Sequence, residues 1–124
     1  MNPPDATIGA VFLRHVSVWE NGRVGELKSI IDDDYMGHTS AGERDADGLR
    51  KRIEAFRSSF RDIHFSIRDQ VIDGDKVATR LECTAVENAT NRAVHMWGMN
   101  LSVVRKGLIV EEWAVWETAY NGAS

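Results

Sequence analysis

The chain has 124 residues, a length typical of one domain, and we expect a single domain over residues 1–124. It carries 15 Lys and Arg against 19 Asp and Glu, a net charge of −4, which argues against a nucleic-acid partner because such proteins present a basic surface. No apolar run approaches the roughly 20 residues that cross a bilayer, and the N-terminal residues lack a secretory pattern. Cys83 is the only cysteine, so no internal disulfide forms. We therefore expect a cytoplasmic protein with no membrane partner.

Three helices are predicted in the first half of the chain. Apolar residues recur at steps of three and four from Ile8 to Trp19, and this spacing is typical of a helix with one buried face that ends at Asn21-Gly22. The same spacing returns twice after it. These two further patterns place apolar residues at Val24, Leu27, Ile30 and Ile31, and at Leu49, Ile53, Phe56 and Phe60. Asp47 is a candidate N-cap of the third helix, and the polar segment 39–47 before it is expected to be a loop.

The period changes to two in the second half, as in half-buried strands. Ile63, Phe65 and Ile67 alternate with polar residues, and residues 73–75 (Asp-Gly-Asp) are a hairpin signal. Turns at residues 88–91 and 106–107 separate the further predicted strands 76–86, 93–105 and 108–118. Helices followed by a meandering antiparallel sheet predict an α+β fold in which three N-terminal helices pack on the concave face of a curved sheet. A cavity between the two layers is the expected ligand site.

Two stretches of the second half resemble the SnoaL-like polyketide cyclases of the nuclear transport factor 2-like superfamily. Residues 74–80 (GDKVATR) are similar to a hairpin of that family, and residues 107–113 (GLIVEEW) are similar to its closing strand. Trp19 and the pair Tyr35 and His38 fit its first two helices. The resemblance implies a cone-shaped α+β domain related to ketosteroid isomerases and limonene epoxide hydrolases. It also implies cofactor-independent aldol cyclisation or isomerisation of a small apolar organic ligand that contains a carbonyl group.

The adjacent residues Glu111 and Glu112 are candidates for acid–base chemistry. Neighbours on a strand point to opposite faces, so only one of them faces the cavity, and both faces of this strand are apolar enough to lie inside. The resemblance favours Glu111, because the family places its acid–base residue two positions before the Trp. A carboxylate in an apolar cavity has a raised pKa, which suits it to remove a proton beside a carbonyl. The alternative for either residue is a solvated position at the edge of the sheet.

Tyr35, His38 and His95 are the other candidate catalytic residues. Tyr35 and His38 follow the second predicted helix, at the cavity mouth in related enzymes, where Tyr35 could stabilise an enolate. His95 shares the most apolar strand face with Trp97 and Met99, and we expect that face to be buried against the helices or in a dimer. The alternative roles are a packing residue for Tyr35, a surface residue for His38, and a core residue bonded to the backbone for His95.

The candidate substrate-binding residues are aromatic or polar side chains on the expected cavity elements. They are His15, Trp19, Arg80, Glu82, Trp97, Met99, Trp113, Trp116 and Glu117. Arg80 and Glu82 resemble the Arg-x-Asp of limonene epoxide hydrolases and would activate water if they pointed inward, but the apolar alternation of their strand places them outside. A homodimer through the outer face of the sheet is expected, with Arg80, Glu82 and Trp116 as candidate contacts.

No cofactor is implied by the sequence. It contains no zinc-ligand spacing and no Gly-rich phosphate loop, and Cys83 has no basic neighbour that would activate its thiol. We therefore expect no metal. The alternative to an enzyme is a ligand-binding or accessory module of the same fold.

Overall fold

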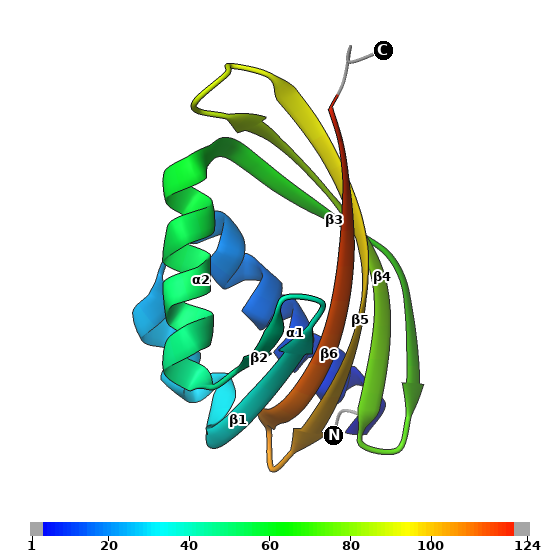
Figure 1. Ribbon diagram of the computed structural model, residues 1–124. Coiled ribbons are helices and arrows are strands. Elements are labelled where there is room, and N and C mark those ends of the chain that lie inside the picture. Colours follow the sequence, from blue (N-terminus) through cyan, green and yellow to red (C-terminus); the bar gives the residue numbers. More distant parts are fainter. Residues whose placement is uncertain (1–3, 121–124) are drawn as a thin grey trace.

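The computed structural model describes residues 4–120, which form a helical layer packed on a curved sheet (Figure 1). The helical layer contains α1 (Pro4–Asn21), a short 3-10 helix (Val24–Ser29) and α2 (Ala46–Ser59). The sheet has the strand order β2-β1-β6-β5-β4-β3, and every neighbouring pair is antiparallel except β1 and β6. Its strands are β1 (Ile31–Thr39), β2 (Gly42–Arg44), β3 (Phe60–Asp73), β4 (Lys76–Glu87), β5 (Ala93–Arg105) and β6 (Leu108–Tyr120). The predicted α+β fold is confirmed.

Helix α1 follows the apolar stripe seen in the sequence. Val11, Phe12 and Val16 are buried in the core between the helices and the sheet. The helix ends as predicted at Gly22, which has a φ of +77° and donates its N–H to the Val18 carbonyl at 2.8 Å. Glycine accepts this left-handed conformation without strain, so it stops the helix at this point.

Helix α2 begins earlier than the sequence suggests. Its N-cap is Asp45 rather than the predicted Asp47, and the Asp45 carboxylate accepts a backbone N–H of the first turn at 2.8 Å. Leu49 and Ile53 are fully buried, as expected from their spacing. Phe60 is not the last apolar residue of this helix but the first residue of β3.

The segment between α1 and α2 differs most from the prediction. The second expected helix is only a six-residue 3-10 helix, which buries Leu27, and the chain then becomes β1 from Ile31 onward. The expected loop 39–47 contains the short strand β2. Three consecutive Asp residues disfavour a strand locally, but β1 is held by parallel pairing with β6, beside which the Ile109 N–H donates to the Ile30 carbonyl at 2.9 Å.

Strands β3 to β6 form the meander that the turn signals predict. The hairpin turns contain Gly74, Asn91 and Gly107, each with a positive φ. Figure 1 shows the sheet curving around α1 and α2, which lie on its concave side. Alternate residues of β4, such as Val77 and Leu81, are buried on this side against the helices.

The convex face of the sheet is not covered by the helices. Trp97, Met99 and Leu101 alternate along β5 on this face and are 48%, 49% and 36% exposed. Of the two alternatives expected for this apolar face, burial against the helices is therefore wrong, and burial in a dimer stays a prediction. The other residues of the alternation face the concave side. Toward the end of β5 they are the polar residues Asn100 and Ser102.

Candidate active site

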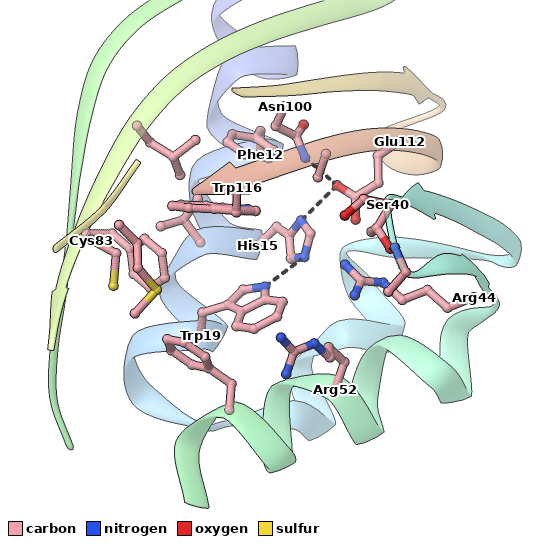
Figure 2. Close-up of a pocket in the computed structure, with 18 of the residues that line it drawn as sticks. Phe12, His15, Trp19, Ser40, Arg44, Arg52, Cys83, Asn100, Glu112 and Trp116 are labelled. Atoms are coloured by element: carbon pink, nitrogen blue, oxygen red, sulfur yellow. Dashed lines mark hydrogen bonds and ion pairs between the residues drawn. The ribbon is translucent and has the colours of Figure 1, made fainter. Parts of the chain in front are cut away.

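A cavity of about 320 Å³ lies between the helices and the concave face of the sheet. Figure 2 shows its apolar and polar side chains gathered on different sides. The apolar lining includes Phe12, Trp19, Phe65, Cys83, Met96 and Trp116. The polar lining includes His15, Ser40, Arg44, Arg52, Asn100 and Glu112. A concave, largely apolar pocket with a few convergent polar groups is the usual form of a small-molecule site.

Trp116 lies flat against the neighbouring strand because the residue opposite it has no side chain. Gly98 of β5 pairs with Trp116 of β6, and a Cβ on Gly98 would lie 2.5 Å from the indole. Trp116 also packs edge-on against Phe65, with ring centroids 6.0 Å apart. The glycine therefore shapes the apolar wall of the cavity.

Glu112 is the carboxylate that faces this cavity, and it is only 1% exposed. Its Oε1 accepts a hydrogen bond from the Tyr35 hydroxyl, and its Oε2 accepts one from Asn100 Nδ2 at 2.9 Å. Burial opposes ionisation, but the electrostatic attraction of nearby His15, the two hydrogen-bond donors and the charge of Arg44 hold the pKa of Glu112 below its ordinary value. Glu112 is therefore ionised at neutral pH.

His15 presents an N–H group to the same space. The Trp19 indole N–H, which can only donate, points at His15 Nε2 at 3.2 Å, so Nε2 is the acceptor. Burial lowers the pKa of His15, so the ring is neutral and its one proton lies on Nδ1. Nδ1 is 3.6 Å from Glu112 Oε2, beyond hydrogen-bond distance, and has no hydrogen-bond partner in the described residues. A buried donor and an ionised carboxylate therefore converge (Figure 2).

Glu111, which the resemblance favours, lies on the opposite face of β6. Its Oε2 is 2.7 Å from His38 Nε2, while His38 Nδ1 is 2.8 Å from Glu43 Oε2. His38 also stacks on Trp113 with ring centroids 5.0 Å apart. The hydrogen bond to Glu111, with further contributions from Glu43, raises the pKa of His38. The expectation that Glu111, His38 and Trp113 face the cavity is therefore wrong.

Arg80, Glu82 and His95 form surface networks on the convex face. His95 Nε2 lies 2.6 Å from Glu82 Oε1, and Arg68 donates to Glu82 Oε2 at 2.5 Å. Arg80 pairs with Asp69 at 2.7 Å. None of the three lines the cavity, so the water-activating role considered for Arg80 and Glu82 finds no access to it. The strand alternation predicted the outward orientation of Arg80 and Glu82 correctly, whereas the expectation of His95 as a catalytic residue in the cavity is wrong.

The remaining predicted residues divide between the two faces. Trp97 and Met99 are about half exposed on the convex face, and Glu117 lies opposite Trp97 in the register, so these three do not line the cavity. Tyr35 is buried rather than placed at the mouth, and it contacts the cavity-lining residues Glu112 and Arg44. The predicted residues that the structure brings together around the cavity are His15, Trp19 and Trp116.

Sequence reasoning missed Asn100, Arg44 and Arg52. Asn100 and Ser102 are the polar end of the alternation on the concave face of β5, and a polar pair inside an apolar alternation is a signal of a site. The opposite face of the strand is more apolar, which makes this polar pair hard to recognise from the sequence. Arg44 lies in the segment that was expected to be a loop.

Metal and thiol chemistry have little support in the described part of the chain. Among residues 4–120, no group of three or more His, Cys, Asp or Glu side chains is placed to hold a metal ion. Burial raises the pKa of the Cys83 thiol to about 12, so this cavity-lining group stays protonated at neutral pH. In the same part of the chain, no helix has both the length and the apolar character needed to span a bilayer.

Solved structures of similar shape include one described as a candidate polyketide cyclase and one described as a candidate hydroxylase. IdmH from Streptomyces antibioticus, described as a candidate polyketide cyclase, has a TM-score of 0.82 and 25% identity over 89% of this chain and 91% of that chain. TsrD from Streptomyces laurentii has a TM-score of 0.83 and 19% identity over 94% and 92%. AclR from Streptomyces galilaeus, described as a candidate hydroxylase, has a TM-score of 0.81 and 20% identity over 91% and 80%.

The last two likenesses show the fold alone, because their identities are low. Among curated proteins, none matches the chain with significant similarity. The family model of the SnoaL-like polyketide cyclases matches residues 10–120, which is most of the sequence. The chain therefore belongs to the SnoaL-like polyketide cyclase family.

Proposed function

We propose that this chain is a cofactor-independent enzyme that moves a proton on a small apolar carbonyl compound, in an aldol cyclisation or an isomerisation. The observation that carries the proposal is the convergence of ionised Glu112 and the unpartnered N–H of His15 in a largely apolar cavity. Membership of a cyclase family supports this class of chemistry. An apolar wall also excludes water, which strengthens every electrostatic interaction inside.

Glu112 acts as the base in this mechanism. A substrate whose carbonyl oxygen accepts the His15 Nδ1–H bond presents an adjacent C–H group to Glu112 Oε2. Oε2 takes the proton, the C–H electron pair forms the enolate double bond, and the negative charge that develops on oxygen is stabilised by the His15 N–H. In a cyclisation the enolate carbon attacks a second carbonyl of the same molecule, and Glu112 returns its proton to the new alkoxide. In an isomerisation the proton returns to a different carbon.

Tyr35 and Asn100 are positioning residues for this base. Each donates to one oxygen of Glu112, so the carboxylate has a fixed orientation before substrate binds. Ser102 contributes a longer contact of 3.4 Å and is itself bonded to Asn100 Oδ1 at 2.6 Å. Because these donors favour the charged carboxylate, the base form of Glu112 persists into mildly acidic solution.

The test is deuterium exchange into 2-tetralone, an apolar ketone with acidic α-protons, followed by mass spectrometry in D₂O. We expect wild-type protein to accelerate exchange above buffer and Glu112→Gln to lose about 100-fold or more of that acceleration, the usual contribution of a general base. Glu111→Gln is the matched control, because its side chain lies one residue away on the opposite face. Equal activity of the two variants would contradict the assignment of Glu112 as the base.

A ligand-binding module without catalysis is the second candidate. One observation favours it: the hydrogen bonds that hold Glu112 also weaken it as a base, since they stabilise its charged form. If wild-type protein binds 2-tetralone but exchanges its protons no faster than buffer, the module is the better description.

A further inference from the structure

Two arginines line the polar side of the cavity, and the proton transfer proposed above uses neither. Arg44 is the last residue of β2, and Arg52 lies on α2, so separate elements bring their guanidinium groups to one place. Figure 2 shows both groups pointing into the cavity on the side away from Cys83. Both cations therefore line the site, Arg44 as a half-buried residue and Arg52 as an exposed one.

Neither arginine forms an ion pair within the described residues. By contrast, Arg50 on the same helix as Arg52 pairs with Asp47 at 2.6 Å and with Glu54 at 2.9 Å. The Arg44 side chain contacts the Tyr35 hydroxyl, but its Nε is buried and has no hydrogen-bond partner there. Buried donors are nearly always satisfied in folded proteins, so an unsatisfied one calls for an explanation such as a bound ligand.

The cavity has an excess of positive charge. Glu112 is the one carboxylate among its described lining residues, and Arg44 lies close enough to help keep it ionised. Because His15 is neutral, two guanidinium groups face a single carboxylate. The whole chain has a net charge of −4, so this local excess does not follow from its composition. A positive site with apolar walls favours an organic anion over a neutral molecule.

We infer that Arg44 and Arg52 form an anion subsite, and that the ligand of this cavity is an apolar carbonyl compound that carries a carboxylate. The inference rests on the proposed function and deepens it by naming the charged end of the substrate. The carboxylate lies at the guanidinium groups, which can each donate two parallel N–H bonds to it. The carbonyl then reaches His15, and the apolar body lies against Trp116.

The test compares the binding of 2-naphthoate with that of its methyl ester, measured by isothermal titration calorimetry at low ionic strength. The two probes share one apolar body, and only the acid carries a charge. We expect wild-type protein to bind the acid about tenfold more tightly, the size of one hydrogen bond to a charged group. Added salt should weaken the binding of the acid and leave the binding of the ester unchanged.

Arg52→Gln is the main variant, because the Arg52 side chain is exposed and its loss should leave the fold intact. It should remove most of the preference for the acid, and Arg44→Gln should do the same. Arg50→Gln is the matched control and should leave both affinities unchanged, since Arg50 is paired outside the cavity. Equal binding of acid and ester by wild-type protein, or an equal loss of both in Arg52→Gln, would overturn the subsite.

Glu112→Gln separates this inference from the proposed function. It should abolish proton exchange while it keeps or strengthens the binding of 2-naphthoate, because it removes the negative charge near Arg44. A preference for the acid without exchange activity would leave the subsite standing and remove the proton transfer. Exchange activity without a preference for the acid would remove the subsite alone.

Discussion

At Glu112, burial and hydrogen bonding act on the same carboxyl in opposite directions. Burial alone would favour the neutral acid, since a charge in a region of low dielectric is poorly solvated. The Tyr35 hydroxyl and the Asn100 amide replace the water that burial removes, one on each carboxylate oxygen. The charge state of the candidate base therefore depends on these two donors as well as on the nearby His15 and Arg44.

Replacing Tyr35 with Phe should destabilise the protein and make Glu112 easier to protonate. The ring keeps its volume, but Glu112 Oε1 loses its donor, and leaving a buried group without a partner costs about 1–3 kcal/mol. A carboxyl whose folded pKa is depressed contributes stability above its unfolded pKa, and this stability is lost as pH falls through the folded pKa. In Tyr35→Phe that acid loss should begin at a higher pH. Urea denaturation from neutral to acidic pH measures both effects.

Ser102→Ala is the control for Tyr35→Phe. The Ser102 hydroxyl is 3.4 Å from Glu112 Oε2, which is a weak contact. Removing this hydroxyl should therefore shift the pH at which stability is lost in acid less than removing the Tyr35 hydroxyl does. If both variants shift that pH equally, the hydrogen bond from Tyr35 is not the main interaction that stabilises the charged carboxylate.

At the scale of elements, local sequence patterns predicted where the hairpins lie but not which face of each strand points inward. Turn residues are local signals, so the boundaries of β4 and β5 could be read from the sequence. The inward face of β6 could not, because both of its faces are apolar and a shift of one residue exchanges Glu111 for Glu112. The outward Trp97 and Met99 added to this error, since an apolar face is normally the buried one.

Strand β1 shows a second limit of local reasoning. Its three aspartates and the apolar Ile30 and Ile31 suggest a helix that is followed by a loop. The chain is nevertheless extended, because β6, more than 70 residues away in the sequence, provides a parallel partner. Non-local pairing of this kind overrides weak local preference. The pairing also matters for the site, because it places Tyr35 beside Glu112.

His38 links three strands, and this link should depend on pH. It lies on β1 between Glu111 of β6 and Glu43 of β2, and these contacts raise its pKa. A histidine whose folded pKa is raised contributes stability below its unfolded pKa, and that contribution is lost as pH rises through the folded pKa. The stability difference between wild-type protein and His38→Gln should therefore shrink as pH rises above about 6.5, the unfolded pKa of His.

Urea midpoints of the two proteins at several pH values measure this difference. Glu111→Gln should flatten the same pH dependence in part, because the hydrogen bond to Glu111 is the largest cause of the shift. A difference between wild-type protein and His38→Gln that is constant with pH would show that His38 contributes by stacking on Trp113 alone.

At the scale of the whole molecule, the convex face of the sheet exposes a group of adjoining apolar side chains. Met99 and Val115 pair across β5 and β6, as do Leu101 and Trp113, and all four are between 36% and 59% exposed. Trp97 extends this patch along β5. A monomeric protein seldom exposes adjoining apolar side chains on this scale, and such patches usually mark an interface.

We propose that two copies of the chain pair through this face. A twofold interface brings the same patch of each copy together, so the apolar centre meets itself and its charged rim can face a second rim. The rim carries side chains of both signs, since Arg80 pairs with Asp69 and Glu82 pairs with Arg68. Such an arrangement buries Trp97 and Trp113 without bringing only like charges together, and it leaves the cavity on the concave side open. Trp116, which was expected at this interface, lines that cavity instead.

The expected result is a dimer at micromolar concentration in size-exclusion chromatography with light scattering. Val115→Glu places a charge in the centre of the patch, where burial without a partner is costly, and should give a folded monomer. Leu13→Glu is the matched control: Leu13 is an apolar residue of α1 with 40% exposure, away from the sheet, and its substitution should leave the dimer intact. Wild-type protein that runs as a monomer would contradict this interface. If Val115→Glu is monomeric yet keeps its preference for 2-naphthoate over the ester, each copy holds a complete cavity and the convex face serves assembly alone.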